Sequence, residues 1–151
     1  MVIEEFFMLD ESYLDEIAEL YRSAFKGEPW NDDWSDTAQL REYLKDVSGD
    51  FKGLNYGLKN EGKLVAVSLG TVRHWWEGTN YNIEEFCVDP AAQGQGIGSH
   101  FLDLIESDIR TKGLAGIFLQ TDNDMPSYKF YLKNGFSDLT KHVSLYKSVK
   151  E

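Results

Sequence analysis

The chain has 151 residues and a net charge of −11, from 26 acidic and 15 basic side chains. This length fits one domain, and the 42% of hydrophobic residues are enough for a sizeable core, which excludes a disordered chain. The acidic balance argues against nucleic acid and anionic membranes as partners and favours cationic ones.

Sequence signals for a membrane span, a secretory leader, a disulfide or a metal are missing. No apolar run reaches the roughly 18 residues that a span needs, and the N-terminal Met-Val-Ile-Glu-Glu segment is acidic where a secretory signal is basic. The single cysteine, Cys87, excludes an internal disulfide, and its apolar neighbours indicate a buried structural thiol. The histidines are scattered without metal-ligand spacing. We therefore expect a cytoplasmic protein that binds no membrane and no metal.

In chain order, the first half predicts a strand, two helices and three further strands. Residues 2–7 predict the first strand, and apolar residues at helical spacing predict helices over residues 12–25 and 35–47, the second capped by Ser35 or Asp36. The periodicity then changes to that of strands. Residues 54–59 and 64–74 predict a long hairpin, and residues 79–88 predict the next strand.

The second half opens with a glycine-rich turn and a predicted helix over residues 97–112, which Gly113 ends. Residues 115–121 are apolar enough for a central strand, residues 126–133 predict a short helix, and residues 136–139 and 142–148 predict two closing strands. The order β-α-α-β-β-β-α-β-α-β-β indicates a mixed α/β (α+β) fold, with helices packed on one sheet.

The turn Gln93-Gly94-Gln95-Gly96-Ile97-Gly98 is the most informative motif of the chain. Its glycines lack the Cβ atoms that would keep a ligand off the backbone, and they tolerate positive φ, so successive N–H groups can converge on an anion. The helix that follows adds unpaired N–H donors and the positive end of its dipole. The pattern predicts a phosphate site, for which Lys129 and Lys133 are candidate compensating charges in an acidic protein.

Three classes of phosphorylated ligand use such turns. A triphosphate-binding loop needs a Gly-Lys-Ser or Gly-Lys-Thr sequence, which does not occur here. A dinucleotide fingerprint needs other glycine spacing in an early βαβ unit, whereas these glycines are spaced by two and follow antiparallel strands. Coenzyme A is the third class.

Two motifs resemble those of the GNAT superfamily of N-acetyltransferases. Gln93 to Gly98 fits the signature [RQ]-x-x-G-x-[GA], and residues 124–136 are similar to N-x-x-A-x-x-x-Y-x-x-x-G-F, with Asp124 and Ser127 in place of Asn and Ala. The motifs occur in the family's order, separated by one helix and one strand. The layout is also loosely similar to small aminoglycoside 6′-N-acetyltransferases.

The resemblance implies a single acetyltransferase domain over residues 1–151, with a mostly antiparallel sheet and helices on both faces. Acetyl-CoA would be the cofactor, with Tyr131 as general acid and Glu84 or Glu85 as the base that deprotonates the amine. A bulge in their strand would shift the register, so the sequence leaves the choice open, with a slight preference for Glu84. The implied cofactor contacts are Phe86, Cys87, Val88, Gln93, Gly94, Gln95, Gly96, Ile97, Gly98, Ser99, Asp124, Ser127 and Lys133.

The acceptor pocket is expected between the loop that joins the first two helices and the end of the long hairpin. Glu28, Trp30 and Trp34 in the loop and Trp76 in the hairpin could bind a cationic amine through ion pairs and cation–π contacts. The expected reaction is acetylation of a primary amine on a small cationic acceptor in a ternary complex. A non-catalytic acyl-CoA-binding sensor or structural module and a nucleotide-binding protein are the alternatives. Aminoglycosides, polyamines, metabolites and peptides stay open as acceptors, as does the oligomeric state, although dimers are common among similar proteins.

Overall fold

The computed structural model describes residues 3–150, which fall into two compact units, one up to Gln120 and one from Thr121 onward. The first unit contains β1 (Glu4–Met8), α1 (Leu14–Lys26), α2 (Thr37–Val47), β2 (Tyr56–Asn60), β3 (Lys63–Trp75), β4 (Gly78–Val88), α3 (Ile97–Thr111) and β5 (Gly116–Leu119). Short 3-10 helices, Glu11–Tyr13 and Pro90–Ala92, precede α1 and α3. The second unit contains α4 (Pro126–Lys133).

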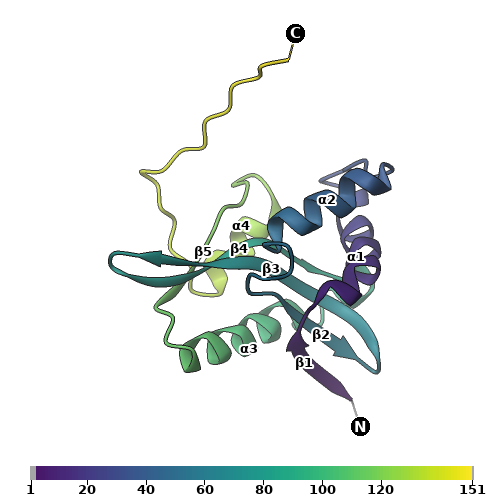
Figure 1. Ribbon diagram of the computed structural model, residues 1–151, viewed down its shortest axis with the longest axis horizontal. Helices are drawn as coiled ribbons and strands as arrows, with labels where there is room; N and C mark the ends of the chain where they lie inside the picture. The colour runs from purple at the N-terminus through teal and green to yellow at the C-terminus, as the bar shows by residue number, and fades with distance from the viewer. Residues whose placement is uncertain (1–2, 151) are drawn as a thin grey trace. The chain divides into compact units, whose positions relative to one another are not determined.

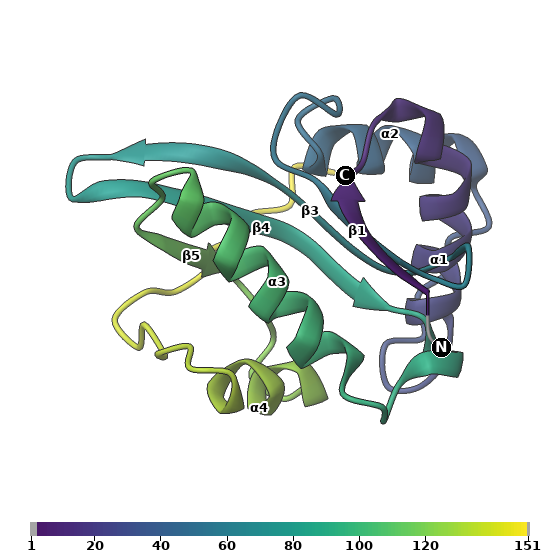
Figure 2. The same ribbon diagram turned by 90° about the horizontal axis from the view of Figure 1, so that it is seen from below.

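The sheet of the first unit has five strands in the order β1-β2-β3-β4-β5. Its first four strands are antiparallel neighbours, and β5 runs parallel to β4 after the α3 crossover. Helices α1 and α2 cover one face of the sheet and α3 covers the other (Figure 1 and Figure 2). The fold is therefore α+β, with a mixed, mostly antiparallel sheet between helices.

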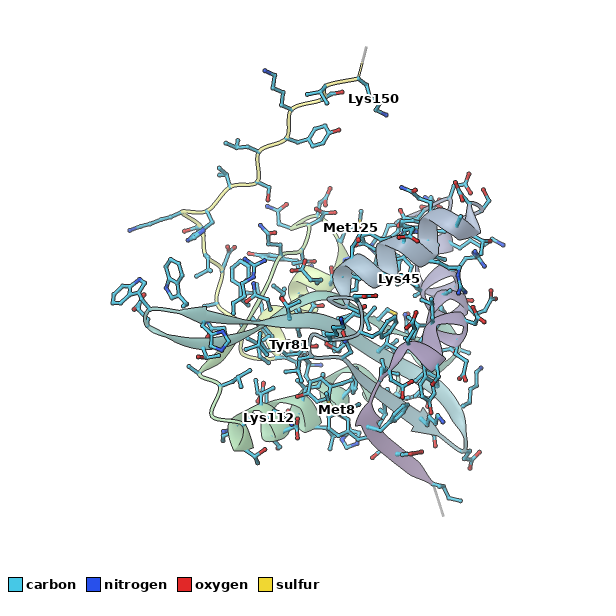
Figure 3. All side chains as sticks on the ribbon, viewed as in Figure 1. Met8, Lys45, Tyr81, Lys112, Met125 and Lys150 are labelled. Atoms are coloured by element: carbon cyan, nitrogen blue, oxygen red, sulfur yellow. The ribbon has the colours of Figure 1, made fainter. Side chains whose placement is uncertain are left out.

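Each face of the sheet has its own apolar layer, because strand side chains alternate between the faces. On one face, Val67 and Leu69 of β3 belong to a buried cluster with Leu40 and Leu44 of α2 and residues of α1. On the α3 face, Tyr56, Tyr81 and Phe101 are fully buried, and the Ser68 and Tyr81 hydroxyls are 2.7 Å apart. Figure 3 labels Tyr81 on β4 and Lys112 just beyond α3.

A β-bulge interrupts the β3–β4 ladder at the two glutamates that the sequence leaves as alternative bases. Leu69 pairs with Glu85, but the next residue, Gly70, pairs with Ile83, so Glu84 is the additional residue on β4. A Cβ atom on Gly70 would overlap the backbone carbonyl oxygen of Asn82, which explains glycine there. The bulge reverses the alternation along β4 and thereby sends Glu85 and Cys87 to the face that α1 and α2 cover.

Most of the predicted elements are confirmed, with boundaries that move by a few residues. The cap of α2 is Asp36, whose side chain accepts a hydrogen bond of 3.0 Å from the Gln39 N–H, while Ser35 stays outside the helix. Of the predicted first strand, residue 2 lies outside the described part of the chain.

The predicted closing strands at residues 136–139 and 142–148 are wrong, because neither segment is a strand in the structure. For the same reason β5 is an edge strand and not a central one among the described residues. Alternating apolar residues indicate a preference for extended backbone, but a strand also needs a hydrogen-bonding neighbour. The apolar side chains here lie open to solvent, with Leu145 91% and Tyr146 88% exposed.

Two features of the described residues concern the expectations about membranes and metals. None of the helices within residues 3–150 combines the length and hydropathy that crossing a bilayer requires. In the same residues, no three His, Cys, Asp or Glu side chains are grouped so that they could hold a metal ion.

Candidate functional site

The glycine-rich turn between β4 and α3 has the backbone conformation that the motif predicts. Gly94 and Gly96 have φ values of 81° and 75°, in the left-handed region that side chains with a Cβ disfavour. An added Cβ on either glycine would meet no atom within 4 Å, so the space in front of both is open. Upstream, the Asp89 carboxylate accepts a hydrogen bond from the Ala91 N–H at 2.9 Å, which fixes the start of the turn.

Helix α3 begins at Ile97 with Gly96 as its N-cap and no side-chain cap. Its first intrahelical bond runs from the His100 N–H to the Gly96 carbonyl at 3.1 Å, so the N–H groups of Ile97, Gly98 and Ser99 have no intrahelical acceptor. The first turn carries no acidic side chain. An open, uncapped N-terminus with positive dipole charge fits the pyrophosphate of acetyl-CoA.

Strand β4 leads into this turn and continues past the end of β5. Pairing between the two strands runs from Asn80 with Gly116 to Ile83 with Leu119, where β5 ends, whereas β4 continues to Val88.

The predicted contact residues at this end of β4 differ in what their side chains can do. The Phe86 ring packs against Phe101 of α3 with centroids 5.4 Å apart. The Cys87 side chain is buried in the core under α1 and α2. The Val88 carbonyl accepts a hydrogen bond of 3.3 Å from the Gln93 side-chain amide. Cys87 therefore offers a ligand only its backbone.

The two candidate bases occupy different environments. Glu84 is exposed at the bulge, whereas Glu85 is mostly removed from solvent between α1, α2 and the sheet. Tyr21 of α1 donates a hydrogen bond to Oε1 of Glu85 at 3.2 Å, and Tyr43 of α2 donates a short one to the same oxygen. Burial raises the pKa of the Glu85 carboxyl, and the nearby charges of Asp32 and Glu84 act in the same direction.

The predicted acceptor residues separate into two groups. In the α1–α2 loop, Trp30 packs edge-on against Phe25 at 5.3 Å, while Glu28 is exposed. Trp34 stacks on Tyr43 at 5.3 Å and meets Tyr21 edge-on at 5.7 Å. Trp34 therefore lies against both tyrosines that bind Glu85.

Trp76 lies apart from this loop. It occupies the turn after Trp75 at the tip of the β3–β4 hairpin and is 81% exposed. The hairpin extends away from α1 and α2 (Figure 1 and Figure 2). At roughly 3.3 Å per residue, its tip is about 20 Å from Glu85 along β4. The structure does not bring Trp76 together with Trp30 and Trp34.

The remaining predicted residues belong to the second unit. Tyr131 of α4 is buried, and its ring contacts Phe130 and Phe136 at centroid distances of 5.3 and 5.2 Å. The Ser127 and Thr121 hydroxyls are 2.7 Å apart. Asp124 and Lys133 are exposed. The Tyr-to-Phe part of the motif is thus a small aromatic cluster.

Sequence reasoning missed Tyr21 and Tyr43. Both lie on the buried faces of their helices, where spacing alone identifies them as core aromatics. A signal was nevertheless present, because a phenol hydroxyl directed into a core needs a hydrogen-bond partner. Their common partner, Glu85, is distant in the sequence, so only the fold reveals the contact.

Comparisons with solved structures show the same fold at low identity. An aminoglycoside acetyltransferase from an uncultured soil metagenomic sample, in complex with sisomicin, is 22% identical, with a TM-score of 0.70 over 99% of this chain and 97% of that chain. A possible acetyltransferase from Clostridium difficile 630 is 18% identical, with a TM-score of 0.80 over 98% and 99%. The aminoglycoside N-acetyltransferase AAC(6')-Iy in complex with CoA is 16% identical, with a TM-score of 0.71 over 99% and 97%.

Sequence comparison supplies the family. No curated protein matches the chain. A family model described as the acetyltransferase (GNAT) family matches residues 14–136, which include the Glu85 strand, the glycine-rich turn and the Tyr131 segment. The chain therefore belongs to the GNAT family of acetyltransferases, acyltransferases that use acetyl-CoA.

Proposed function

We propose that this chain transfers the acetyl group of acetyl-CoA to the primary amine of a small, cationic acceptor, by direct attack in a ternary complex. One observation carries the proposal. Strand β4 holds a sheltered carboxylate, Glu85, beside an aromatic loop, and the Pro90–Ala92 3-10 helix and the glycine-rich turn then connect it to the uncapped N-terminus of α3. A proton acceptor and an anion site are thus built on a single strand-turn-helix segment.

In the proposed site, acetyl-CoA is bound mainly by backbone groups. Bound acetyl-CoA supplies an activated acetyl group as a thioester. The N–H groups from Gly94 to Ser99 bind the pyrophosphate, with Gln93 and Gln95 beside it, because this turn offers open donors and no negative side chain. Backbone groups from Phe86 to Val88 line the arm of the cofactor. The resemblance to the family motif makes Asp124, Ser127 and Lys133 candidates for further cofactor contacts.

The proton transfers are assigned to Glu85 and Tyr131. An amine is protonated near neutral pH and must lose a proton before it can attack, and Oε2 of Glu85 accepts that proton. We assign this role to Glu85 in preference to Glu84, because its raised pKa brings a carboxylate closer to the working pH of a general base. Tyr131 holds the motif position of the general acid, where its hydroxyl donates a proton to the leaving thiolate as the C–S bond breaks. The proton that the attacking nitrogen loses as the amide forms restores the phenol, and the proton on Glu85 passes to solvent.

The acceptor binds at the α1–α2 loop. Trp30 and Trp34 offer aromatic faces, and Glu28 and Asp32 offer negative charge, a combination that suits an ammonium group. The soil-metagenome neighbour that binds sisomicin supports a polycationic amine as the acceptor class. The expectation that Trp76 also contacts the acceptor stays a prediction, and Trp76 lies at the hairpin tip, apart from this loop.

We further propose that the chain works as one acetyltransferase domain. The family match over residues 14–136 runs through both compact units.

The test is release of free thiol from acetyl-CoA, measured across a panel of amines that includes aminoglycosides, polyamines and peptides. We expect amine-dependent release with at least one cationic acceptor and formation of the acetylated amine by mass spectrometry. Thermal stabilisation by acetyl-CoA without turnover on any amine would contradict the proposal and favour a binding module.

Variants separate the assigned roles. Glu85→Gln should lower kcat/KM by about 10²-fold or more, the usual contribution of a general base, whereas Glu84→Gln should lower it only a few-fold. Tyr131→Phe should lower kcat while the Kd of acetyl-CoA stays near that of the wild type. Equal effects of the two glutamate variants would remove Glu85 from its assigned role.

A further inference from the structure

Two phenols converge on the carboxylate of Glu85. Tyr21 comes from α1 and Tyr43 from α2, and both hydroxyls donate to the same oxygen, Oε1. Within residues 3–150, Oε2 accepts no hydrogen bond, so one oxygen is held and the other has no partner among these residues. This division between the two oxygens is what a positioned proton acceptor requires.

The phenols are themselves held in place. Their rings lie 6.0 Å apart, and Trp34 packs against both, stacked on Tyr43 and edge-on to Tyr21. Burial, followed by the neighbouring charge of Glu85, raises the pKa of both tyrosines. Both therefore stay protonated and act as hydrogen-bond donors throughout the neutral range.

We propose that Tyr21 and Tyr43 are positioning residues for acetyl transfer: they anchor Oε1 of Glu85 and stabilise its charge, so that Oε2 is oriented to take the proton of the acceptor amine. The inference rests on the proposed function of Glu85. Donors from both α1 and α2 restrain the carboxylate more than a donor from one helix would.

The hydrogen bonds from the two phenols shift the pKa of Glu85 in the opposite direction to its other surroundings. Burial raises the pKa of Glu85, and the charges of Asp32 and Glu84 raise it further, whereas the two hydrogen bonds lower it. The titratable groups around Glu85 are Tyr21 on α1, Asp32 in the α1–α2 loop, Tyr43 on α2, and Glu84 and Cys87 on β4. Removing a phenol donor destabilises the ionised form, so the pKa of Glu85 must rise.

The experiment compares Tyr43→Phe and Tyr21→Phe with the wild type by two readouts. The first is a ¹³C NMR titration of the Glu85 carboxyl group in the protein without ligands, assigned with Glu85→Gln. The second is the pH profile of kcat/KM for the best acceptor amine. In each variant we expect the midpoint of the Glu85 titration and the acidic limb of the kcat/KM profile to move to higher pH by the same amount, roughly one pH unit. This is the shift that the loss of a hydrogen bond to a charged group predicts.

Tyr56→Phe is the matched control. Its hydroxyl donates to the Asp108 carboxylate at 2.6 Å on the opposite face of the sheet, so the variant also removes a phenol–carboxylate bond. It should leave the Glu85 titration and the acidic limb unchanged. Melting temperatures of all variants show which of them are folded, and either Tyr21→Phe or Tyr43→Phe suffices for the test.

The outcomes separate this inference from the proposed function. An unshifted Glu85 titration in both folded variants overturns the inference, whatever the turnover. A shifted titration with an unshifted acidic limb also overturns it, because the carboxylate would then not limit proton transfer. Absence of turnover on every amine refutes the proposed function instead, and the inference about acetyl transfer falls with it.

Discussion

At the scale of single residues, the proposed cofactor site depends on Gly94 and Gly96, which have positive φ values and open space where a Cβ would lie. Alanine at Gly96 should cost about 1–2 kcal/mol of stability, because left-handed backbone is unfavourable for a residue with a Cβ. It should also weaken acetyl-CoA binding by roughly tenfold or more, since a shift of the turn misaligns several N–H donors. Calorimetric titration with acetyl-CoA and urea unfolding measure the two effects.

Gly113→Ala is the control for Gly96→Ala. Gly113 has a φ of 77°, and an added Cβ there would also meet no atom within 4 Å. It follows the other end of α3, away from the N-terminal donors. We expect the same loss of stability with unchanged affinity for acetyl-CoA, and parallel losses of affinity in both variants would speak against the turn as the pyrophosphate site.

At the scale of elements, the β3–β4 hairpin decides which glutamate faces the helices. Gly70→Ala should destabilise the protein by roughly 1–3 kcal/mol or more, because its Cβ would overlap the Asn82 carbonyl opposite the bulge. Urea unfolding measures the loss, and Gly27→Ala, whose Cβ would meet nothing within 4 Å, should be nearly neutral. A Gly70→Ala protein with wild-type stability and activity would show that the bulge tolerates a different register.

The same hairpin shows which structural features the sequence can predict and which it cannot. Periodicity and turn residues predict β3, β4 and the turn between them, since these signals are local. The bulge at Glu84 is not local, because it arises from the close approach of Gly70 to β4. The sequence therefore identifies both glutamates as candidates and leaves their environments undetermined.

The cofactor and acceptor sites differ in predictability for a related reason. The proposed phosphate-binding turn is contiguous in sequence, so its glycines can be recognised from spacing alone. The surroundings of Glu85 combine residues from α1, α2 and β4 that only tertiary packing brings together. The prediction of the closing strands is wrong for a different reason. Residues 142–148 have the local pattern of a strand, but a local pattern alone supplies no pairing partner.

At the scale of the whole molecule, the net charge of −11 acts on the two substrates in opposite directions. The protein attracts a polycationic acceptor over long range and repels acetyl-CoA, which is a polyanion. Salt screens both effects, because the Debye length falls from about 30 Å at 0.01 M ionic strength to about 10 Å at 0.1 M. We expect kcat/KM for such an acceptor to fall by roughly tenfold over this range, while the KM for acetyl-CoA decreases. A monoamine with a single charge should show a smaller slope, so steady-state kinetics with the two acceptors, at matched pH, isolates the effect of charge. If both acceptors respond alike, the general field of the protein does not steer the acceptor, and the local carboxylates of the α1–α2 loop must supply its binding energy.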